Sequence, residues 1–278
     1  MTVAPAPPEL PDLRVVSLDS LVLHEEADAR RVGLLQRRFV VEQIVKNPPV
    51  VAPMSGGRFV VLDGANRIAA MRALGLPDAV VQVVDYDTVE LTTWFHLVVG
   101  MTPDDLLATV ASASDGRLGA LSQSRARSDL EAGRIAVYLV DPEGGFFGVA
   151  APSDPAARVT LLKALVATYS GQCDIHRIQT DAMSTLRSLY TELAGLVVFP
   201  PYGPGDILTL AEHDVKLPTG ITRHVIPRRA LRLNTDIDFL WGDSPLAEKN
   251  RWLSEWTRHK LQSREIRYYE ESTFLFDE

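Results

Sequence analysis

The stretch of sequence that decides the fold is residues 58–75, which read RFVVLDGANRIAAMRALG. An apolar run from Phe59 to Leu62 predicts a strand, Asp63-Gly64 predicts a tight turn, and apolar residues at helical spacing from Ile68 onwards predict a helix. A helix that begins at this turn presents unpaired backbone N–H groups at the positive end of its dipole. Arg67 adds a guanidinium in the first turn. The stretch therefore predicts an anion-binding turn suited to phosphate.

The carboxylate of Asp63 needs a separate explanation, because it would repel a bare phosphate. A metal ion or a substrate hydroxyl beside it would supply one. Two purely structural readings also stay open: Asp-Gly can form a hairpin turn, and Asp63 can cap the helix. The helical spacing after the turn argues against the hairpin, whereas a cap can coexist with a binding function.

The composition is that of an ordinary soluble globular protein, with 278 residues, 46% of them hydrophobic, and a formal net charge of −8. No apolar run is long enough to span a membrane, and residues 1–8 lack the features of a secretory signal, so we expect a cytoplasmic protein without a membrane partner. The single cysteine, Cys173, excludes an intrachain disulfide. The negative charge argues against nucleic acid as a partner. The oligomeric state is not predicted.

The order of the segments predicts an α+β protein in two parts. Residues 1–12 are rich in proline and alanine and are expected to form a flexible tail, followed by a small α/β domain at residues 13–102. A polar stretch at residues 112–134 indicates a boundary, so residues 103–278 are predicted to form a second mixed α/β domain, with a cleft between the two. Helices are expected at residues 29–46, 155–169, 206–212 and 247–262, after the turn at 63–64 as far as Gly75, and from Pro103. Strands are expected at residues 14–18, 50–52, 59–62, 79–84, 89–98, 135–140, 145–149, 175–179, 196–199, 222–226 and 265–269.

Trp94 and His96 lie two residues apart on an expected strand, so both side chains should lie on one face of it. Core packing and substrate contact both remain open for this pair. Arg223 alternates with apolar neighbours, which is typical of a solvent-facing strand residue, although the nearby Gly220 allows a ligand to approach closely. Cys173 and His176 are too few to make a metal site.

Five blocks of sequence carry a family resemblance: LHE at residues 23–25, DGANR at 63–67, TWFH at 93–96, YSG at 169–171 and PTGITR at 218–223. In this order they resemble the free L-serine kinase family, which is built on the ParB/sulfiredoxin-like fold. The resemblance implies a ParB/sulfiredoxin-like domain at residues 13–102 that binds nucleotide and phosphate, with the second domain completing an active-site cleft. It further implies transfer of a phosphoryl group from ATP or ADP, with Mg²⁺, to the hydroxyl of L-serine. The product, O-phospho-L-serine, would supply siderophore or amino-acid precursors.

The resemblance also implies a role for each matching residue. Glu25 would be the catalytic general base, and Asp63 a second catalytic carboxylate that orients the hydroxyl or the magnesium ion. The residues themselves leave open which carboxylate is the base and which serves the metal, and the metal ligands are not predicted. The implied nucleotide-binding residues are Gly64, Ala65, Asn66 and Arg67, and the implied substrate-binding residues are Trp94, Thr222 and Arg223.

The chain departs from related patterns at the turn. Asn66 stands where the family often has histidine, so a proton-transfer role at that position is not expected. The turn has no cysteine, which excludes sulfiredoxin chemistry. Two alternative functions remain: a ParB-like, nucleotide-responsive DNA-binding regulator, and a catalytically silent ligand sensor. The acidic charge argues against the regulator, and the retained Glu25 and Asp63 argue against the sensor.

Overall fold

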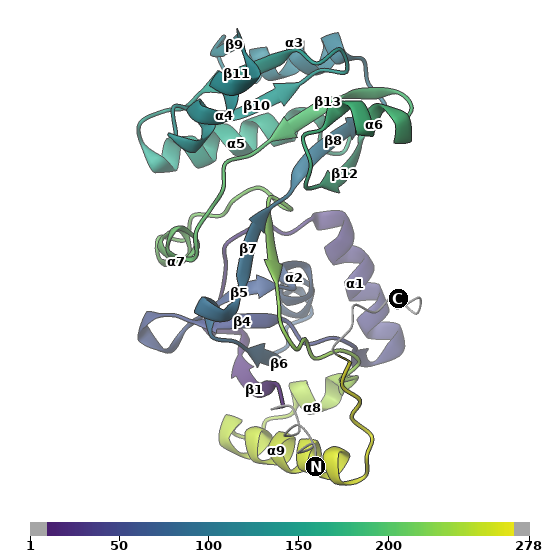
Figure 1. Cartoon of the computed structure of the whole chain (residues 1–278). Coiled ribbons are helices and arrows are strands. Elements are labelled where there is room, and N and C mark those ends of the chain that lie inside the picture. The colour runs from purple at the N-terminus through teal and green to yellow at the C-terminus, as the bar shows by residue number, and fades with distance from the viewer. Residues whose placement is uncertain (1–9, 270–278) are drawn as a thin grey trace, which may run out of the picture.

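The computed structural model describes residues 10–269, and it is a mixed α/β structure built on two sheets that lie one above the other in Figure 1. Most of the predicted tail lies outside the described residues, and Asp12 already begins the first strand. No helix within residues 10–269 is both long enough and apolar enough to span a membrane.

The first sheet is mixed and has the strand order β1-β6-β4-β5-β2. Its strands are β1 (Asp12–Ser17), β6 (Asp78–Val83), β4 (Val50–Pro53), β5 (Phe59–Asp63) and β2 (Leu21–Leu23). The helices α1 (Ala29–Glu42), α2 (Ala65–Ala73), α8 (Ile237–Trp241) and α9 (Leu246–Gln262) share a hydrophobic core with it. Strand β5 leads directly into α2, as residues 58–75 predict.

Strands β4 and β5 form a hairpin that is buried on both faces. The two strands pair antiparallel, with Ala52 opposite Val60. Val51 and Val61 point into the core that contains α1 and α2, whereas Ala52, Val60 and Leu62 join the core that continues into the upper part of the molecule. Successive side chains of a strand point to opposite faces, and here each face packs against a different core. Both faces therefore need apolar residues, which explains the continuous apolar run at residues 59–62.

The second sheet is entirely antiparallel and has the order β12-β8-β13-β10-β11-β9. Its strands are β12 (Asp174–Ile178), β8 (Phe95–Val99), β13 (Leu193–Val198), β10 (Ile135–Val140), β11 (Phe146–Ala150) and β9 (Leu118–Leu121). Residues of α3 (Pro103–Ala113), α5 (Pro155–Tyr169) and α7 (Pro204–Glu212) share one core with it. Residues of α4 (Gln123–Glu131) and α6 (Met183–Leu189) share a second, separate core with it.

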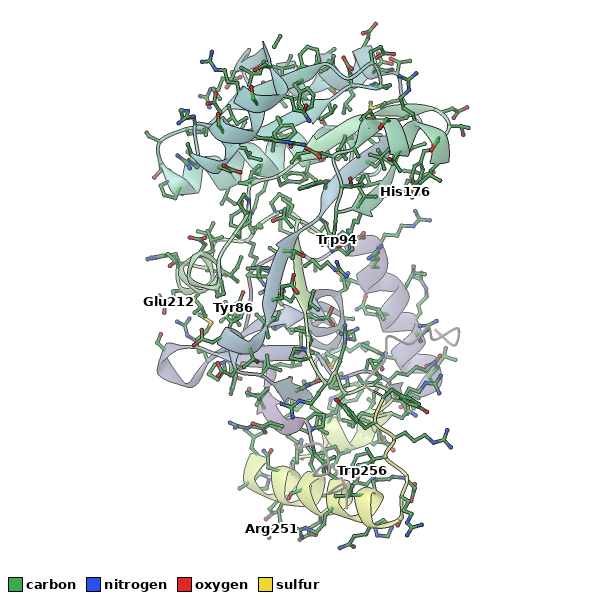
Figure 2. All side chains as sticks on the ribbon, viewed as in Figure 1. Tyr86, Trp94, His176, Glu212, Arg251 and Trp256 are labelled. Carbon is green, nitrogen blue, oxygen red and sulfur yellow. The ribbon has the colours of Figure 1, made fainter. Side chains whose placement is uncertain are left out.

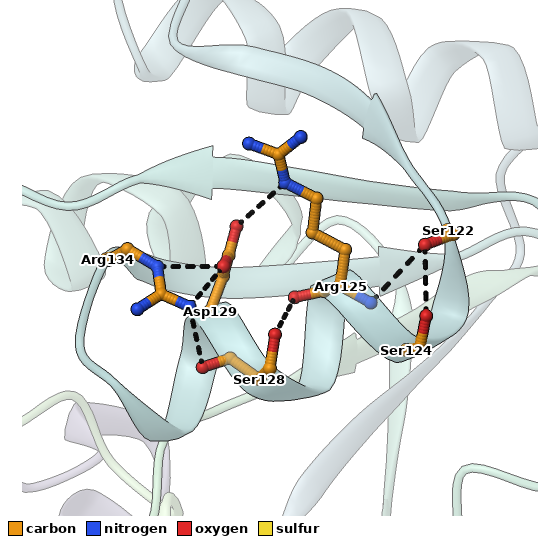
Figure 3. A network of polar contacts seen from close by, with 6 residues as sticks. All are labelled: Ser122, Ser124, Arg125, Ser128, Asp129 and Arg134. Atoms are coloured by element: carbon orange, nitrogen blue, oxygen red, sulfur yellow. Dashed lines mark hydrogen bonds and ion pairs between the residues drawn. The ribbon is translucent and has the colours of Figure 1, made fainter.

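The polar stretch at residues 112–134 is folded rather than an open linker, because it contains β9 and α4. Ser122 caps α4 by accepting a hydrogen bond from the backbone N–H of Arg125. Figure 3 shows how Asp129 then accepts hydrogen bonds from Arg125 and from both Nε and Nη2 of Arg134. These contacts stabilise the start of α4 and its connection to Arg134, while Ala126 and Leu130 pack the helix on β10.

The two sheets divide the chain differently from the boundary predicted between residues 102 and 103. Strand β8 precedes that boundary and belongs to the second sheet. The last two helices follow it and return to the first sheet, so that α9 lies beneath β1 in Figure 1. A buried ion pair fixes this return: Nζ of Lys249 lies 2.6 Å from Oδ2 of Asp78 and donates to the carbonyl of Leu240.

Two short ladders connect distant segments. Strand β14 (Thr222–Val225) pairs with β7 (Glu90–Thr93), and β15 (Thr235–Asp236) pairs with β3 (Ile44–Val45). The first ladder shows that the strand predicted at residues 89–98 is really two strands separated at Trp94. Because β3 forms its own ladder, α1 ends at Glu42, before the predicted end at residue 46.

The prediction of a strand at residues 265–269 is wrong. The chain leaves α9 through a left-handed residue, Arg264, and forms no strand over these residues. Tyr268 and Tyr269 are exposed rather than paired with a sheet edge. Tyrosine favours strands, but a strand forms only where it can pair with a sheet edge, and residues 265–269 pair with none.

Candidate functional site

A single pocket of about 810 Å³ gathers all nine of the site residues predicted from the sequence. Its walls come from α1, the end of β2, the β5–α2 turn, Trp94, β12 and residues 219–229. Lining residues that the sequence did not single out as binding residues include His24, Arg31, Arg38, Arg177, His224 and Arg229. The roles of the nine predicted residues stay predictions, although their convergence in one pocket is a property of the fold.

The β5–α2 turn depends on Gly64, which has a φ of 97° and is the N-cap of α2. A Cβ at this position would lie 2.9 Å from Nη2 of Arg67 and 3.0 Å from the side chain of Pro49, so a larger residue does not fit. No side chain caps the helix. Both structural readings of Asp63 are therefore wrong: the turn does not start a hairpin, and Asp63 does not cap α2.

Asp63 instead forms ion pairs with Arg67 and with Arg229, a residue that lies 166 positions later in the chain. Burial acts to raise the pKa of the Asp63 carboxyl, but the two guanidinium groups outweigh it and hold the pKa below its ordinary value. Asp63 is therefore an ionised, doubly paired carboxylate and a weak proton acceptor.

Arg67 presents the feature that most directly indicates an anion. Its Nε is buried and has no hydrogen-bond partner among the described residues, although Nη2 is paired with Asp63. Buried donors without partners are rare because they lose their hydrogen bonds to water. Together with the uncapped N–H groups of α2, this donor makes the turn suited to bind phosphate oxygens. The neighbouring Asn66 has a structural contact, since its Oδ1 accepts from the backbone N–H of Asp28 at 2.8 Å.

Glu25 lies on another wall of the pocket, and neutral groups hold it in place. Its Oε2 accepts from the backbone N–H of Gly220 at 2.8 Å, and its Oε1 accepts from the backbone N–H and the hydroxyl of Thr222 at 2.6 and 2.5 Å. Residues 24–26 are also bonded to the backbone of Leu217. Gly220 has a φ of 79°, and a Cβ there would collide with the guanidinium of Arg177, so this close approach requires glycine.

Two histidines lie behind this wall. His24 is buried, with Nδ1 2.7 Å from the carbonyl of Val61 and Nε2 2.8 Å from the hydroxyl of Thr222. His224 meets it edge to face and bonds to the hydroxyl of Tyr86. Burial lowers the pKa of both rings, that of His224 to about 3, so both are neutral at physiological pH.

Trp94 and His96 do not share an environment as the sequence predicted. Trp94 lies between the two parts of the molecule, as Figure 2 shows, and lines the pocket with the guanidinium of Arg223 4.6 Å from its ring centroid. His96 is a buried core residue that bonds to Tyr169 and to the carbonyl of Gly220, and burial lowers its pKa to about 4. The break between β7 and β8 separates the two side chains, which the spacing alone could not reveal.

The described residues do not fit a metal site built by the protein alone. No group of three or more His, Cys, Asp or Glu side chains within residues 10–269 is arranged to hold a metal ion. Both oxygens of Glu25 accept hydrogen bonds, and Asp63 is paired with two cations.

No family model matches the chain, but ATP-dependent L-serine kinases are similar to it in sequence. The ATP-dependent L-serine kinase SbnI of Staphylococcus aureus is 24% identical over 270 residues, which cover 96% of this chain and 97% of that protein. An ATP-dependent L-serine kinase of Staphylothermus marinus is 23% identical over 81% of this chain and 90% of its own length.

Solved structures show the same fold. SbnI of Staphylococcus aureus with a C-terminal truncation has a TM-score of 0.71 at 21% identity, covering 91% of this chain and 97% of that one. A free serine kinase in complex with AMP has a TM-score of 0.70 at 19% identity, covering 85% of this chain and 97% of that one. Over nearly its whole length the chain is thus similar in sequence to ATP-dependent L-serine kinases and shares their fold, which confirms the family resemblance that its sequence blocks predict.

Proposed function

We propose that this protein is a free L-serine kinase that transfers the terminal phosphoryl group of ATP, or of ADP, to the hydroxyl of L-serine. One observation carries the proposal: a single pocket contains both an anion-binding turn and a carboxylate that neutral donors hold. The turn has the unpaired buried Nε of Arg67, and the carboxylate is Glu25. Phosphoryl transfer needs this combination of charge stabilisation and a positioned base more than it needs covalent chemistry.

The surroundings of the two carboxylates support different roles. Glu25 is the general base, because within residues 10–269 its oxygens accept hydrogen bonds from neutral donors and form no ion pair. In the reaction, the serine O–H bond breaks and its proton moves to Glu25 while the serine oxygen attacks the terminal phosphorus. The bond from that phosphorus to the bridging oxygen breaks, and the nucleotide leaves with one phosphate fewer. Asp63 stays ionised and positions Arg67 and Arg229 against the phosphates.

The nucleotide phosphates bind at Gly64, Ala65, Asn66 and Arg67, at the N-terminus of α2. This assignment is supported by relatives whose solved structures hold AMP or ADP. Magnesium, as the usual counter-ion of nucleotide phosphates, would enter with the nucleotide. We derive no step from it, because the pocket carboxylates are already paired.

Serine binds on the side of Trp94, Thr222 and Arg223. Arg223 suits the carboxylate of the amino acid or the phosphate of the product, because its fork of donors matches both. In this proposal the pocket is the active-site cleft between a ParB/sulfiredoxin-like N-terminal domain and the second α/β domain. The product then supplies siderophore or amino-acid precursors in the cytoplasm.

The test is incubation of the purified protein with L-serine, magnesium and either ATP or ADP, followed by detection of O-phosphoserine. We expect product with at least one donor, and less with L-threonine, whose extra methyl group changes the position of the hydroxyl. Glu25→Gln is the matched control, since it keeps the size of the side chain and removes the base. Absence of product with both donors would overturn the proposal, as would full activity of Glu25→Gln.

A further inference from the structure

Three side chains connect the pocket to the backbone of β5. Glu25 Oε1 lies 2.5 Å from the hydroxyl oxygen of Thr222, which lies 2.8 Å from Nε2 of His24. The other ring nitrogen of His24, Nδ1, lies 2.7 Å from the carbonyl oxygen of Val61. The hydroxyl of Thr222 is therefore placed between a carboxylate and an imidazole.

The hydrogens in this arrangement can be counted. A carbonyl oxygen only accepts, so the ring proton of His24 must be on Nδ1. Burial lowers the pKa of His24 and keeps the ring neutral, which makes Nε2 a bare acceptor. The hydroxyl of Thr222 has one hydrogen and two acceptors within bonding distance, Nε2 and the Glu25 carboxylate. It can satisfy only one of them at a time.

The ionisation of Glu25 decides which acceptor is satisfied. When Glu25 is ionised, the hydroxyl donates to the carboxylate, the stronger acceptor, and Nε2 has no donor. When Oε1 gains a proton, it donates to the oxygen of Thr222, and the hydrogen of Thr222 can turn to Nε2 of His24. All three groups are then paired.

We infer that the hydroxyl of Thr222 is a two-position switch, which turns from Glu25 to His24 when Glu25 takes the proton of the substrate. The inference rests on the proposed function for the role of Glu25 as the base. No bond of Thr222 breaks, because its hydrogen only rotates about the Cβ–Oγ bond. Proton transfer to Oε1 ends the hydrogen bond that the hydroxyl of Thr222 donates to the carboxylate. His24 accepts the hydrogen that is released, so it is a positioning residue.

Other titratable and charged groups face this unit from neighbouring elements. His224 on β14 meets the ring of His24, Asp63 at the end of β5 interacts with His224, and Arg177 on β12 interacts with Glu25. Each of these groups contributes to the electrostatic potential around His24 and Glu25. None of them lies between the Thr222 hydroxyl and its two acceptors, so they do not change which group it can reach.

The direct test is an NMR titration of the intact protein with labelled histidine ring nitrogens and labelled glutamate carboxyls. As Glu25 gains its proton, we expect the Nε2 signal of His24 to move part of the way towards its protonated value with the same midpoint, while Nδ1 stays protonated. In Thr222→Val the Nε2 signal should no longer follow Glu25. An Nε2 signal that ignores Glu25 in the wild type overturns the inference. This readout needs no activity, so it is independent of whether the proposed kinase function holds.

The kinetic test compares Thr222→Val, which keeps the shape of the side chain, with Thr222→Ser, which keeps the hydroxyl. We expect kcat to fall about tenfold in Thr222→Val, as for the loss of one supporting hydrogen bond, and to fall less in Thr222→Ser, which retains the hydroxyl. The acidic limb of the pH–rate profile should move in the valine variant only. Equal kcat values for the two variants at matched Tm overturn the inference.

Discussion

The two carboxylates of the pocket differ in what holds them. Glu25 accepts hydrogen bonds from two backbone N–H groups and one hydroxyl, all of them neutral. Asp63 is paired with two guanidinium groups. Neutral donors hold a carboxylate in position without cancelling its negative charge. Cations such as guanidinium groups cancel that charge. Two acidic residues in one pocket thus have surroundings that suit opposite tasks, Glu25 as the proposed base and Asp63 as an anchor for two arginines.

The strongest test of this difference is Glu25→Gln. We expect kcat to fall by about 10²–10⁴-fold, the usual contribution of a general base, while the nucleotide KM stays within a few-fold. Steady-state kinetics of O-phosphoserine formation measures both constants. A rise in KM at unchanged kcat would mean that Glu25 binds rather than accepts a proton.

Asp63→Asn should have a smaller effect. We expect kcat/KM to fall about tenfold, because Arg67 and Arg229 lose the charge-assisted hydrogen bonds that position them. Since the pKa of Asp63 lies below its ordinary value, the difference from wild type should persist at neutral pH and disappear as the pH falls through that pKa. A loss as severe as that of Glu25→Gln would contradict this difference in roles and make Asp63 a candidate base.

Arg229→Met tests whether the partner of Asp63 reaches the phosphates. We expect the nucleotide KM to rise about fivefold with kcat nearly unchanged, which is in keeping with one partly exposed charge contact. The double variant with Asp63→Asn should be less impaired than the sum of the two single effects, because the two residues act as a pair. Strict additivity of the two effects would show that Asp63 and Arg229 act independently.

Arg223→Lys should give the smallest change. Lysine keeps the charge but loses the planar stacking on Trp94, worth about 0.5–1 kcal/mol at exposed sites, so we expect the serine KM to rise about two- to fivefold. Trp94→Phe is the matched variant from the other side of the contact. If serine KM is unchanged in both, serine does not bind on this side of the pocket.

The sequence predicted the local parts of the site well, because local patterns determine them. The strand, glycine turn and helix at residues 58–75 follow from apolar spacing and from the left-handed conformation that Gly64 adopts. All nine residues that the motif blocks singled out line the pocket. What they do there was derived from the resemblance, and the experiments above test it.

The contacts that define the chemistry could not be predicted, because they join distant segments. Arg229 meets Asp63 across 166 positions, and Thr222 meets Glu25 across 197. Neither Arg229, in the basic run after Pro227, nor Arg177, in a strand with alternating polar residues, carries a local signal of binding. The ladder between β7 and β14 brings these parts together, and strand pairing over such distances is not encoded in spacing.

The return of α8 and α9 to the first sheet has a consequence for the order in which a newly made chain can fold. The first sheet is complete in sequence by Val83, yet Ile237, Leu240 and Leu253 cover part of its core. N-terminal parts of a chain usually fold first during synthesis on the ribosome. Here about 170 further residues, from Val83 to Leu253, must be synthesised before that surface of the first sheet is covered. The first sheet is thus made early but completed late, and part of its apolar face stays exposed during that interval.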